Sequence, residues 1–299
     1  MRHVISKDGT RIAYERSGMG PPLVLIHGTG IDHTYWTPLI PKLEQYFTVY
    51  TVDRRGRGQS GDTQPYAIQR EFDDVAAVVD SIPGTVGLLG HSYGALCSLE
   101  AALRTTHIHK LALYEPPVYT TVEVSYPADI RDRFDALLKA GKAEEALLML
   151  FEIGGETSTD ELNLLISLPS WQARVLAAHT IPREQISVKN YSFDPGRFRN
   201  LKTPTLFLLG SESILFYKAA TEALHASLPQ SRLAILPKQR HEAVVTAPEL
   251  FLREVIGFFL GKRWRPASGG KAGGRGLPLT ASYAAGVTGW STTSSGGDG

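Results

Sequence analysis

The chain has 299 residues, of which 42% are apolar and 20% are charged, and its formal net charge is +1. This composition is typical of a globular protein that can bury a large core, and the balanced charge gives no general attraction to nucleic acid or to an anionic membrane. The only cysteine, Cys97, excludes an internal disulfide and a cysteine-based zinc site.

The N-terminal stretch carries charged side chains throughout and lacks the apolar segment of a secretory signal. No later stretch approaches the roughly 18 consecutive apolar residues of a membrane span. We therefore expect a cytoplasmic protein. No metal-ligand spacing is visible, so we also expect no metal and no cofactor.

Strand-like and helix-like segments alternate through the first part of the chain, which is typical of an α/β fold with a mostly parallel sheet. Short apolar runs favour strands buried on both faces, and longer segments with apolar residues at helical spacing favour helices between them. The expected strands are 11–16, 23–26, 47–52, 85–89 and 110–114, and the expected helices are 69–82 and 93–104.

This alternation stops near Val118 and resumes at Pro204. The segment between them has no convincing buried strand. Its expected helices are 129–139, 143–151, 160–167 and 171–179; after it, strands are expected at 205–209 and 232–236 and helices at 216–227 and 248–260.

The pattern predicts an α/β core domain, residues 1–117 and 200–261, with a helical cap, residues 118–199, over its sheet. Residues 262–299 are rich in glycine, serine and threonine and poor in large apolar side chains. Such a composition buries too little surface to offset the entropy of ordering, so we expect this tail to be disordered.

The strongest local motif is Gly90-His91-Ser92-Tyr93-Gly94, which stands between a predicted strand and a predicted helix. A serine on such a tight turn stands clear of the sheet, and the two glycines allow neighbouring backbone to approach. The N-terminus of the helix favours negative charge that develops on a substrate oxygen. The motif therefore predicts Ser92 as a nucleophile.

A serine hydroxyl is a weak nucleophile at neutral pH and needs a general base. Among nine histidines, His241 lies in a polar loop between the last predicted strand and the last predicted helix. Open α/β sheets place their sites at the carboxyl ends of the strands, where this loop lies. We therefore predict His241 as the base, whereas His91 is expected to face away from the nucleophile and to be structural.

The chain resembles the α/β-hydrolase family, and in particular its capped esterase-like members. The resemblance covers residues from about 10 to 261 and depends on four elements: Leu25-Ile26-His27-Gly28-Thr29-Gly30, Asp53-Arg54-Arg55-Gly56-Arg57-Gly58-Gln59-Ser60, the Ser92 motif and the late His241. It implies that the backbone N–H groups of Thr29 and Tyr93 form an oxyanion hole. It also implies that Val118–Arg199 is the cap and that the loop Asp53–Ser60 is structural.

The acid of the expected triad departs from the family pattern. The family usually has an aspartate in the loop after the strand expected at 205–209, and this chain has Ser213 there. A serine cannot stabilise an imidazolium by charge, so the acid has moved or the triad is incomplete. Glu115 is the preferred candidate, because certain haloalkane dehalogenases resemble an arrangement with the acid at the end of the preceding strand. Glu212 and the lack of a working acid stay open as alternatives.

The expected reaction is hydrolysis of a carboxylic ester or related acyl substrate through an acyl-enzyme on Ser92. Lactone, thioester or carbon–carbon hydrolysis and peracid chemistry are alternatives on the same scaffold. A biosynthetic lyase or cyclase and a non-catalytic ligand-binding protein are alternatives of other classes. The expected partner is a small ester-like molecule, and no oligomeric state is predicted. The aromatic residues expected near the pocket are Tyr35, Trp36, Tyr93, Phe151 and Trp171.

Overall fold

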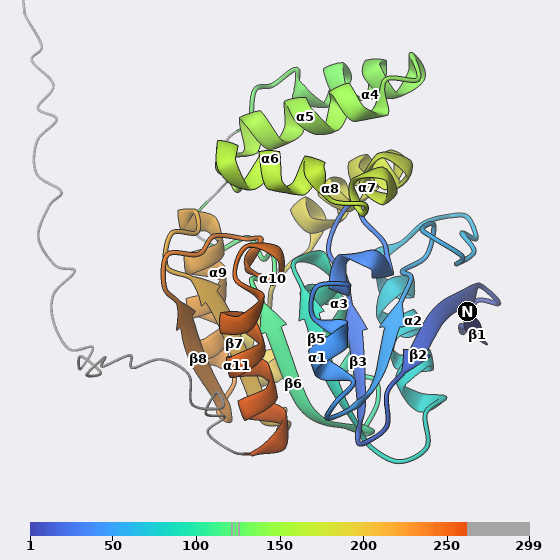
Figure 1. Ribbon diagram of the computed structural model, residues 1–299, viewed down its shortest axis with the longest axis vertical. Coiled ribbons are helices and arrows are strands. Elements are labelled where there is room, and N and C mark those ends of the chain that lie inside the picture. The colour runs from blue at the N-terminus through green and yellow to red at the C-terminus, as the bar shows by residue number, and fades with distance from the viewer. Residues whose placement is uncertain (121, 123, 125, 262–299) are drawn as a thin grey trace, which may run out of the picture. The chain divides into compact units, whose positions relative to one another are not determined.

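The computed structural model describes residues 1–120, 122, 124 and 126–261, so the tail expected to be disordered, 262–299, lies outside the described residues. Eight strands form one sheet in the order β1-β2-β4-β3-β5-β6-β7-β8 (Figure 1). They are β1 (Arg2–Ile5), β2 (Arg11–Ser17), β3 (Pro22–Ile26), β4 (Thr48–Val52), β5 (Val86–His91), β6 (Ile108–Tyr114), β7 (Thr205–Gly210) and β8 (Ser231–Leu236). From β4 to β8 along the sheet all neighbours are parallel, and β1 and β2 add an antiparallel edge. The predicted α/β class is confirmed.

Helices pack on both faces of this sheet, and each face has its own apolar core. One core contains side chains of α2 (Ile68–Asp80), α3 (Tyr93–Ala101) and α9 (Leu215–Ser227). The other contains side chains of α1 (Ile40–Leu43), α10 (Ala243–Thr246) and α11 (Pro248–Leu260). Because both faces are covered, the central strands are apolar on both sides, which is why they read as continuous apolar runs.

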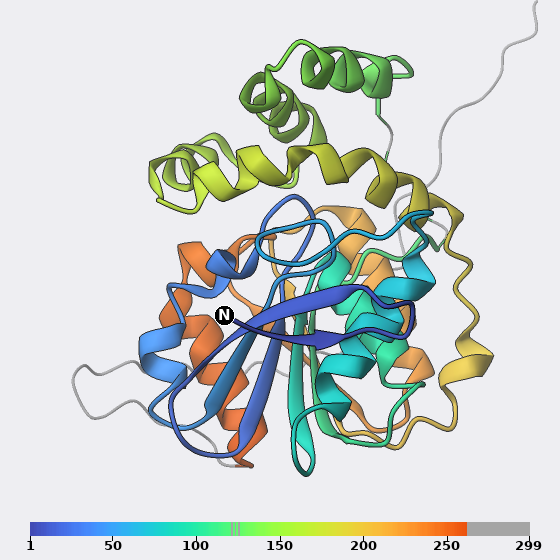
Figure 2. The ribbon, with the colours of Figure 1, turned by 90° about the vertical axis from the view of Figure 1, so that its right-hand side faces the viewer.

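Between β6 and β7 the chain forms a layer of helices, α4 to α8, which lies beyond the carboxyl ends of the parallel strands (Figures 1 and 2). The helices are α4 (Ile130–Lys139), α5 (Ala143–Gly154), α6 (Thr159–Ser167), α7 (Trp171–Ala177) and α8 (Ile181–Asn190). Residues of α4 to α8 share a small apolar core of their own. Short 3-10 turns lie at His33–Trp36, Ala178–Thr180 and Pro195–Phe198.

The elements that were not expected from the sequence include β1, α8 and the short helices α1 and α10. Strand β1 is mostly exposed and pairs only with β2, so it lacks the apolar run that marks the buried strands. Helix α8 contains Pro182 at its second position, where a proline removes no hydrogen bond of the helix. Among the described helices, none has both the length and the apolar character that crossing a bilayer requires.

The register of the central strands brings their last residues together. His91 of β5 is paired with Tyr114 of β6, which is paired with Leu208 of β7. The next residues along β5 and β6 are Ser92 and Glu115, so these two leave the same edge of the sheet side by side.

Candidate active site

Ser92 lies on the turn between β5 and α3, where its backbone φ is 52°. A positive φ is strained for a residue with a side chain, and the flanking glycines make room for the turn. A Cβ on Gly90 would lie 2.6 Å from Cα of Ala95, and a Cβ on Gly94 would overlap the carbonyl oxygens at the end of β3. The Ser92 N–H donates to the carbonyl of Tyr114 at 2.8 Å, which fixes the turn against β6.

Glu115 follows β6 and is completely buried. Its carboxylate accepts three hydrogen bonds: from the N–H of Gly210 at 2.7 Å, from the hydroxyl of Ser213, and from Nδ1–H of His241 at 2.6 Å. A buried carboxylate requires such donors, because nothing else replaces its lost hydration. The structure therefore brings Glu115 and His241 together at the carboxyl edge of the sheet.

His241 lies in the loop between β8 and α10 and is 6% exposed. Because Nδ1 donates to Glu115, Nε2 of the neutral ring is the proton acceptor. The ring of Tyr217 stacks on the imidazole with centroids 4.1 Å apart and planes 12° apart. Burial alone would lower the pKa of His241, but the hydrogen bond and charge of Glu115 outweigh it and the pKa lies above its ordinary value. Glu212, the alternative acid, is exposed.

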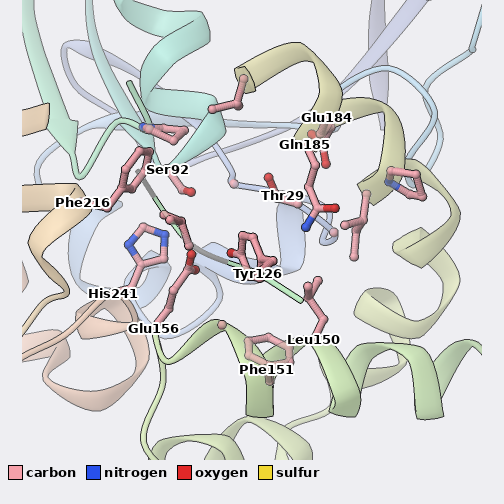
Figure 3. Close-up of a pocket in the computed structure, with 18 of the residues that line it drawn as sticks. Thr29, Ser92, Tyr126, Leu150, Phe151, Glu156, Glu184, Gln185, Phe216 and His241 are labelled. Carbon is pink, nitrogen blue, oxygen red and sulfur yellow. The ribbon is translucent and has the colours of Figure 1, made fainter. Parts of the chain in front are cut away.

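Ser92 and His241 line one cavity of about 420 Å³, and Figure 3 shows both side chains at its wall. The other walls come largely from the helical layer and from α9. They include apolar side chains, among them Leu147, Leu150 and Ile181. A concave, mostly apolar space with a few converging polar groups is typical of a small-molecule site.

The two residues expected to stabilise an oxyanion come from separate parts of the core. Thr29, in the loop after β3, lines the cavity, and Tyr93 is the first residue of α3. Within the described residues, neither backbone N–H donates a hydrogen bond. The ring of Tyr93 is directed elsewhere, and its hydroxyl contacts the hydroxyl of Tyr66 at 2.7 Å.

The expected pocket aromatics divide into two groups. Tyr35 and Phe151 line the cavity, as expected. The rings of Trp36, Tyr93 and Trp171 are buried outside its lining, and the expectation for them is wrong. Trp36 packs in the core on one face of the sheet, whereas Trp171 packs within the helical layer, where its Nε1 donates to Glu144 at 2.7 Å.

The loop Asp53–Ser60 is bound into the core by buried ion pairs. Nε of Arg54 lies 2.8 Å from Glu71 on α2, and Nε of Arg55 lies 2.7 Å from Asp74 on the same helix. Arg54 also reaches the helical layer, where its Nη2 lies 2.5 Å from Glu184 of α8. The structural role of this loop was therefore expected from the resemblance. Its ion pair with the helical layer was not.

His91, expected to face away from Ser92 and to be structural, is one of the residues that line the cavity. Its Nε2–H donates to the backbone carbonyl of His241 at 3.0 Å. Burial lowers the pKa of His91 well below its ordinary value, and the nearby charges of His241 and Arg174 act in the same direction. His91 is therefore a neutral ring that supports the loop carrying His241.

Sequence reasoning missed three carboxylates of the cavity wall: Glu156, Glu184 and Glu242. Glu242 pairs with Arg174 of α7, with Nη2 3.0 Å from the carboxylate. The position of Glu242 next to His241 was a usable signal. Glu156 and Glu184 belong to the helical segment, where no motif distinguishes them from surface residues.

One group of side chains in the described chain has the composition of a metal site: Asp32, His33 and Asp53, whose ligand atoms lie within 4.8 Å of one another. Hydrogen bonds within the fold account for this closeness. Asp53 accepts from Nδ1–H of His33 at 2.6 Å and from the N–H of Gln59 at 2.9 Å, and Asp32 accepts from the N–H of Thr34 at 2.9 Å.

Known proteins share this architecture. The profile of the Alpha/beta hydrolase family matches residues 23–254. The pimeloyl-[acyl-carrier protein] methyl ester esterase of Aeromonas hydrophila is 26% identical over 263 residues, which cover 84% of this chain and 99% of that protein. The putative carbamate hydrolase RutD of Escherichia coli O26:H11 is 26% identical over 249 residues, 77% of this chain and 88% of that protein.

Solved structures of other proteins superpose on this fold. An alpha/beta hydrolase from Sphaerobacter thermophilus superposes with a TM-score of 0.75 at 35% identity, covering 86% of this chain and all of that one. The esterase RhEst1 from Rhodococcus sp. ECU1013 superposes with a TM-score of 0.71 at 24% identity, covering 87% of this chain and 98% of that one, a likeness of fold. With the family profile spanning most of the sheet and the helical layer, this chain is a hydrolase that belongs to the alpha/beta hydrolase family.

Proposed function

We propose that this hydrolase cleaves carboxylic esters or related acyl substrates with Ser92 as nucleophile, His241 as base and Glu115 as the acid that orients it. One observation carries the proposal: a buried carboxylate holds Nδ1 of His241 at 2.6 Å, and this imidazole lines the same cavity as Ser92. The relatives named as an ester esterase and a carbamate hydrolase support an acyl substrate.

In the first step, Nε2 of His241 takes the hydroxyl proton while Oγ of Ser92 attacks the substrate carbonyl. The tetrahedral intermediate carries its negative charge on the former carbonyl oxygen, and the N–H groups of Thr29 and Tyr93 donate to that oxygen. When the intermediate collapses, the bond to the alcohol oxygen breaks and the imidazolium protonates that oxygen. The alcohol leaves, and the acyl group stays on Ser92.

In the second step, His241 removes a proton from water, which attacks the acyl-enzyme carbonyl. The same N–H groups stabilise the second oxyanion, and the imidazolium returns its proton to Oγ of Ser92 as the acid is released. Glu115 stabilises the imidazolium by charge in both steps. It also keeps the proton on Nδ1, so that Nε2 is free to act as base.

We further propose that residues 118–199 act as the cap of this site and that residues 1–117 and 200–261 are its core domain. The helical layer contributes Leu150, Phe151 and Ile181 to the cavity wall, which supports a role in shaping the substrate space. It is held to the core by the buried ion pairs of Glu184 with Arg54 and of Arg174 with Glu242.

Covalent labelling tests the proposal. A fluorophosphonate probe is expected to modify Ser92 in the intact chain, and p-nitrophenyl butyrate is expected to be hydrolysed with release of p-nitrophenol. Both reactions should be lost in Ser92→Ala. If the wild-type chain is neither labelled at Ser92 nor active on p-nitrophenyl acetate and butyrate, the proposal is wrong. Labelling without turnover would instead favour a lyase or cyclase.

A further inference from the structure

The carboxylate of Glu156 reaches the cavity through a short, well-fixed linker. Helix α5 ends at Gly154, and its C-cap Gly155, with a φ of 66°, turns the chain; Ser158 is the N-cap of α6. Ser158 and Glu161 exchange hydrogen bonds in a capping box, which fixes the start of α6. On the other side, Nη1 of Arg240 donates to the carbonyl of Gly155 at 3.4 Å. The linker is thereby attached to the loop that carries the proposed base.

Glu156 is the carboxylate of this wall without a cationic partner. Glu242 is paired with Arg174, and Glu184 is paired with Arg54. In the described part of the chain, no lysine, arginine or histidine nitrogen lies within ion-pair distance of Glu156. Burial raises the pKa of Glu156 above the ordinary value, against the opposing effects of His241 and of the Tyr217 hydroxyl. A carboxylate kept in a mostly apolar cavity without a countercharge is costly to the fold.

Aromatic rings surround this end of the cavity. Phe216 and Tyr217 are neighbours on α9 with ring centroids 5.2 Å apart, and the ring of Tyr119 packs on Phe216 at 5.1 Å. Tyr126 lines the same space, and Figure 3 shows Tyr126, Glu156 and Phe216 grouped near His241. Aromatic faces carry negative potential and attract cations, and quaternary ammonium groups are recognised by cages of such rings.

The chemistry of the proposed reaction assigns this end of the cavity to the alcohol portion of the substrate. His241 must protonate the departing alcohol oxygen, so the alcohol lies beside the imidazole. Glu156 lies near this imidazole (Figure 3), and Tyr217, which stacks on the imidazole ring, lines the same cavity. The unpaired carboxylate and the aromatic wall therefore face the leaving group.

We propose that the site prefers esters whose alcohol portion carries an ammonium group, which Glu156 and the rings of Tyr126, Phe216 and Tyr217 bind. This inference rests on the proposed ester hydrolysis, because that reaction decides which part of the substrate faces Glu156. It assigns Glu156 a role in substrate selection and none in the bond-breaking steps.

Two alcohols of equal shape isolate the effect of charge: choline and its carbon isostere 3,3-dimethyl-1-butanol. Their dissociation constants are measured by calorimetric or NMR titration of the intact chain at a series of pH values, because burial raises the pKa of Glu156 and a preference due to its charge should grow as the pH rises. We expect choline to bind at least about 10-fold more tightly than the neutral alcohol. In Glu156→Gln this preference should disappear while binding of the neutral alcohol stays the same.

Two further variants separate selection by charge from positioning of His241. Glu152→Gln removes an exposed carboxylate of α5 outside the cavity lining and should keep the preference for choline. Tyr217→Phe removes the hydroxyl but keeps the Glu156 carboxylate, and it should keep the preference as well. In steady-state kinetics with the two acetate esters, Glu156→Gln should raise KM for the choline ester alone.

Equal binding of the two alcohols by the wild-type chain would overturn the inference, as would an unchanged preference in Glu156→Gln. A kcat that falls equally for both esters would show a positioning residue, which also overturns it. Failure of the proposed function would give a different result: the fluorophosphonate would not label Ser92, regardless of how tightly choline and 3,3-dimethyl-1-butanol bind.

Discussion

Ser213 donates a hydrogen bond to the carboxylate of Glu115, although the two residues lie 98 positions apart in the chain. The end of β7 and the loop after it, where the family usually has an aspartate, here supply two donors to the carboxylate of Glu115, namely the N–H of Gly210 and the Ser213 hydroxyl. The second carboxylate oxygen is left for Nδ1 of His241. The acid that we propose, Glu115, thus follows the strand next to the one that usually carries it, and Ser213, at the usual position of the acid, donates a hydrogen bond to it.

Glu115→Gln should lower kcat/KM on p-nitrophenyl butyrate by roughly 10⁴-fold, the loss seen when a triad acid is neutralised with its shape kept. The amide can still contact the imidazole, but it no longer stabilises the imidazolium by charge. Steady-state kinetics measure the loss, and circular dichroism checks that the variant is folded.

Glu212→Gln is the matched control, because Glu212 lies in the same loop as Ser213 but is exposed. It should retain activity within about threefold, as surface substitutions usually do little. A loss of several orders of magnitude in this variant, with Glu115→Gln active, would reverse the assignment of the acid.

Ser213→Ala should cost stability more than activity. The substitution removes one of three donors to a buried carboxylate, which corresponds to about 1–3 kcal/mol in the free energy of unfolding. Gly210 and His241 still hold the carboxylate, so kcat/KM should fall by much less than in Glu115→Gln. Urea unfolding and kinetics on the same preparation compare the two effects. An inactive but stable Ser213→Ala would indicate that Ser213 takes part in the chemistry.

The pH dependence of kcat/KM should reflect the raised pKa of His241. The base works only when neutral, so activity falls as the pH drops through this pKa. Since Glu115 raises the pKa against the effect of burial, the acid limb should have its midpoint above the value of about 6.5 for a free imidazole. In Glu156→Gln the limb should shift to lower pH, because Glu156 also favours the imidazolium. A midpoint below that of free imidazole in the wild-type profile would contradict the Glu115–His241 pairing.

The sequence was sufficient for the elements that carry strong local signals. Buried parallel strands are continuous apolar runs, and glycine spacing around Ser92 marks the strained turn, so both were predicted to within a few residues. Strand β1 was missed because it is exposed and its pairing with β2 depends on a neighbour in space. Helix α8 was missed because Pro182 was not recognised as part of a first turn.

The polar wall of the cavity could not be predicted for a different reason. Glu156, Arg174 and Glu184 lie on the helical segment, and their roles depend on how that segment rests on the core. The ion-pair partners of Arg174 and Glu184 are far away in the chain: Arg174 meets Glu242 across 68 positions, and Glu184 meets Arg54 across 130. Local patterns contain no information on such pairs.

The ion pair between Arg174 and Glu242 provides the last prediction. Both side chains are almost completely buried, at 6% and 3% exposed, and they join α7 to the loop beside His241. Arg174→Met should destabilise the fold by about 3–5 kcal/mol, because it leaves Glu242 buried without a countercharge. The double variant Arg174→Met with Glu242→Gln should recover much of this loss, since replacing both members of a buried pair is often nearly neutral. Chemical unfolding of the wild type, both single variants and the double variant gives the coupling energy. Additive losses in the double variant would show that the two side chains stabilise the fold independently and not through their ion pair, with Arg174 acting through its contacts with the rings of Tyr35 and Phe151.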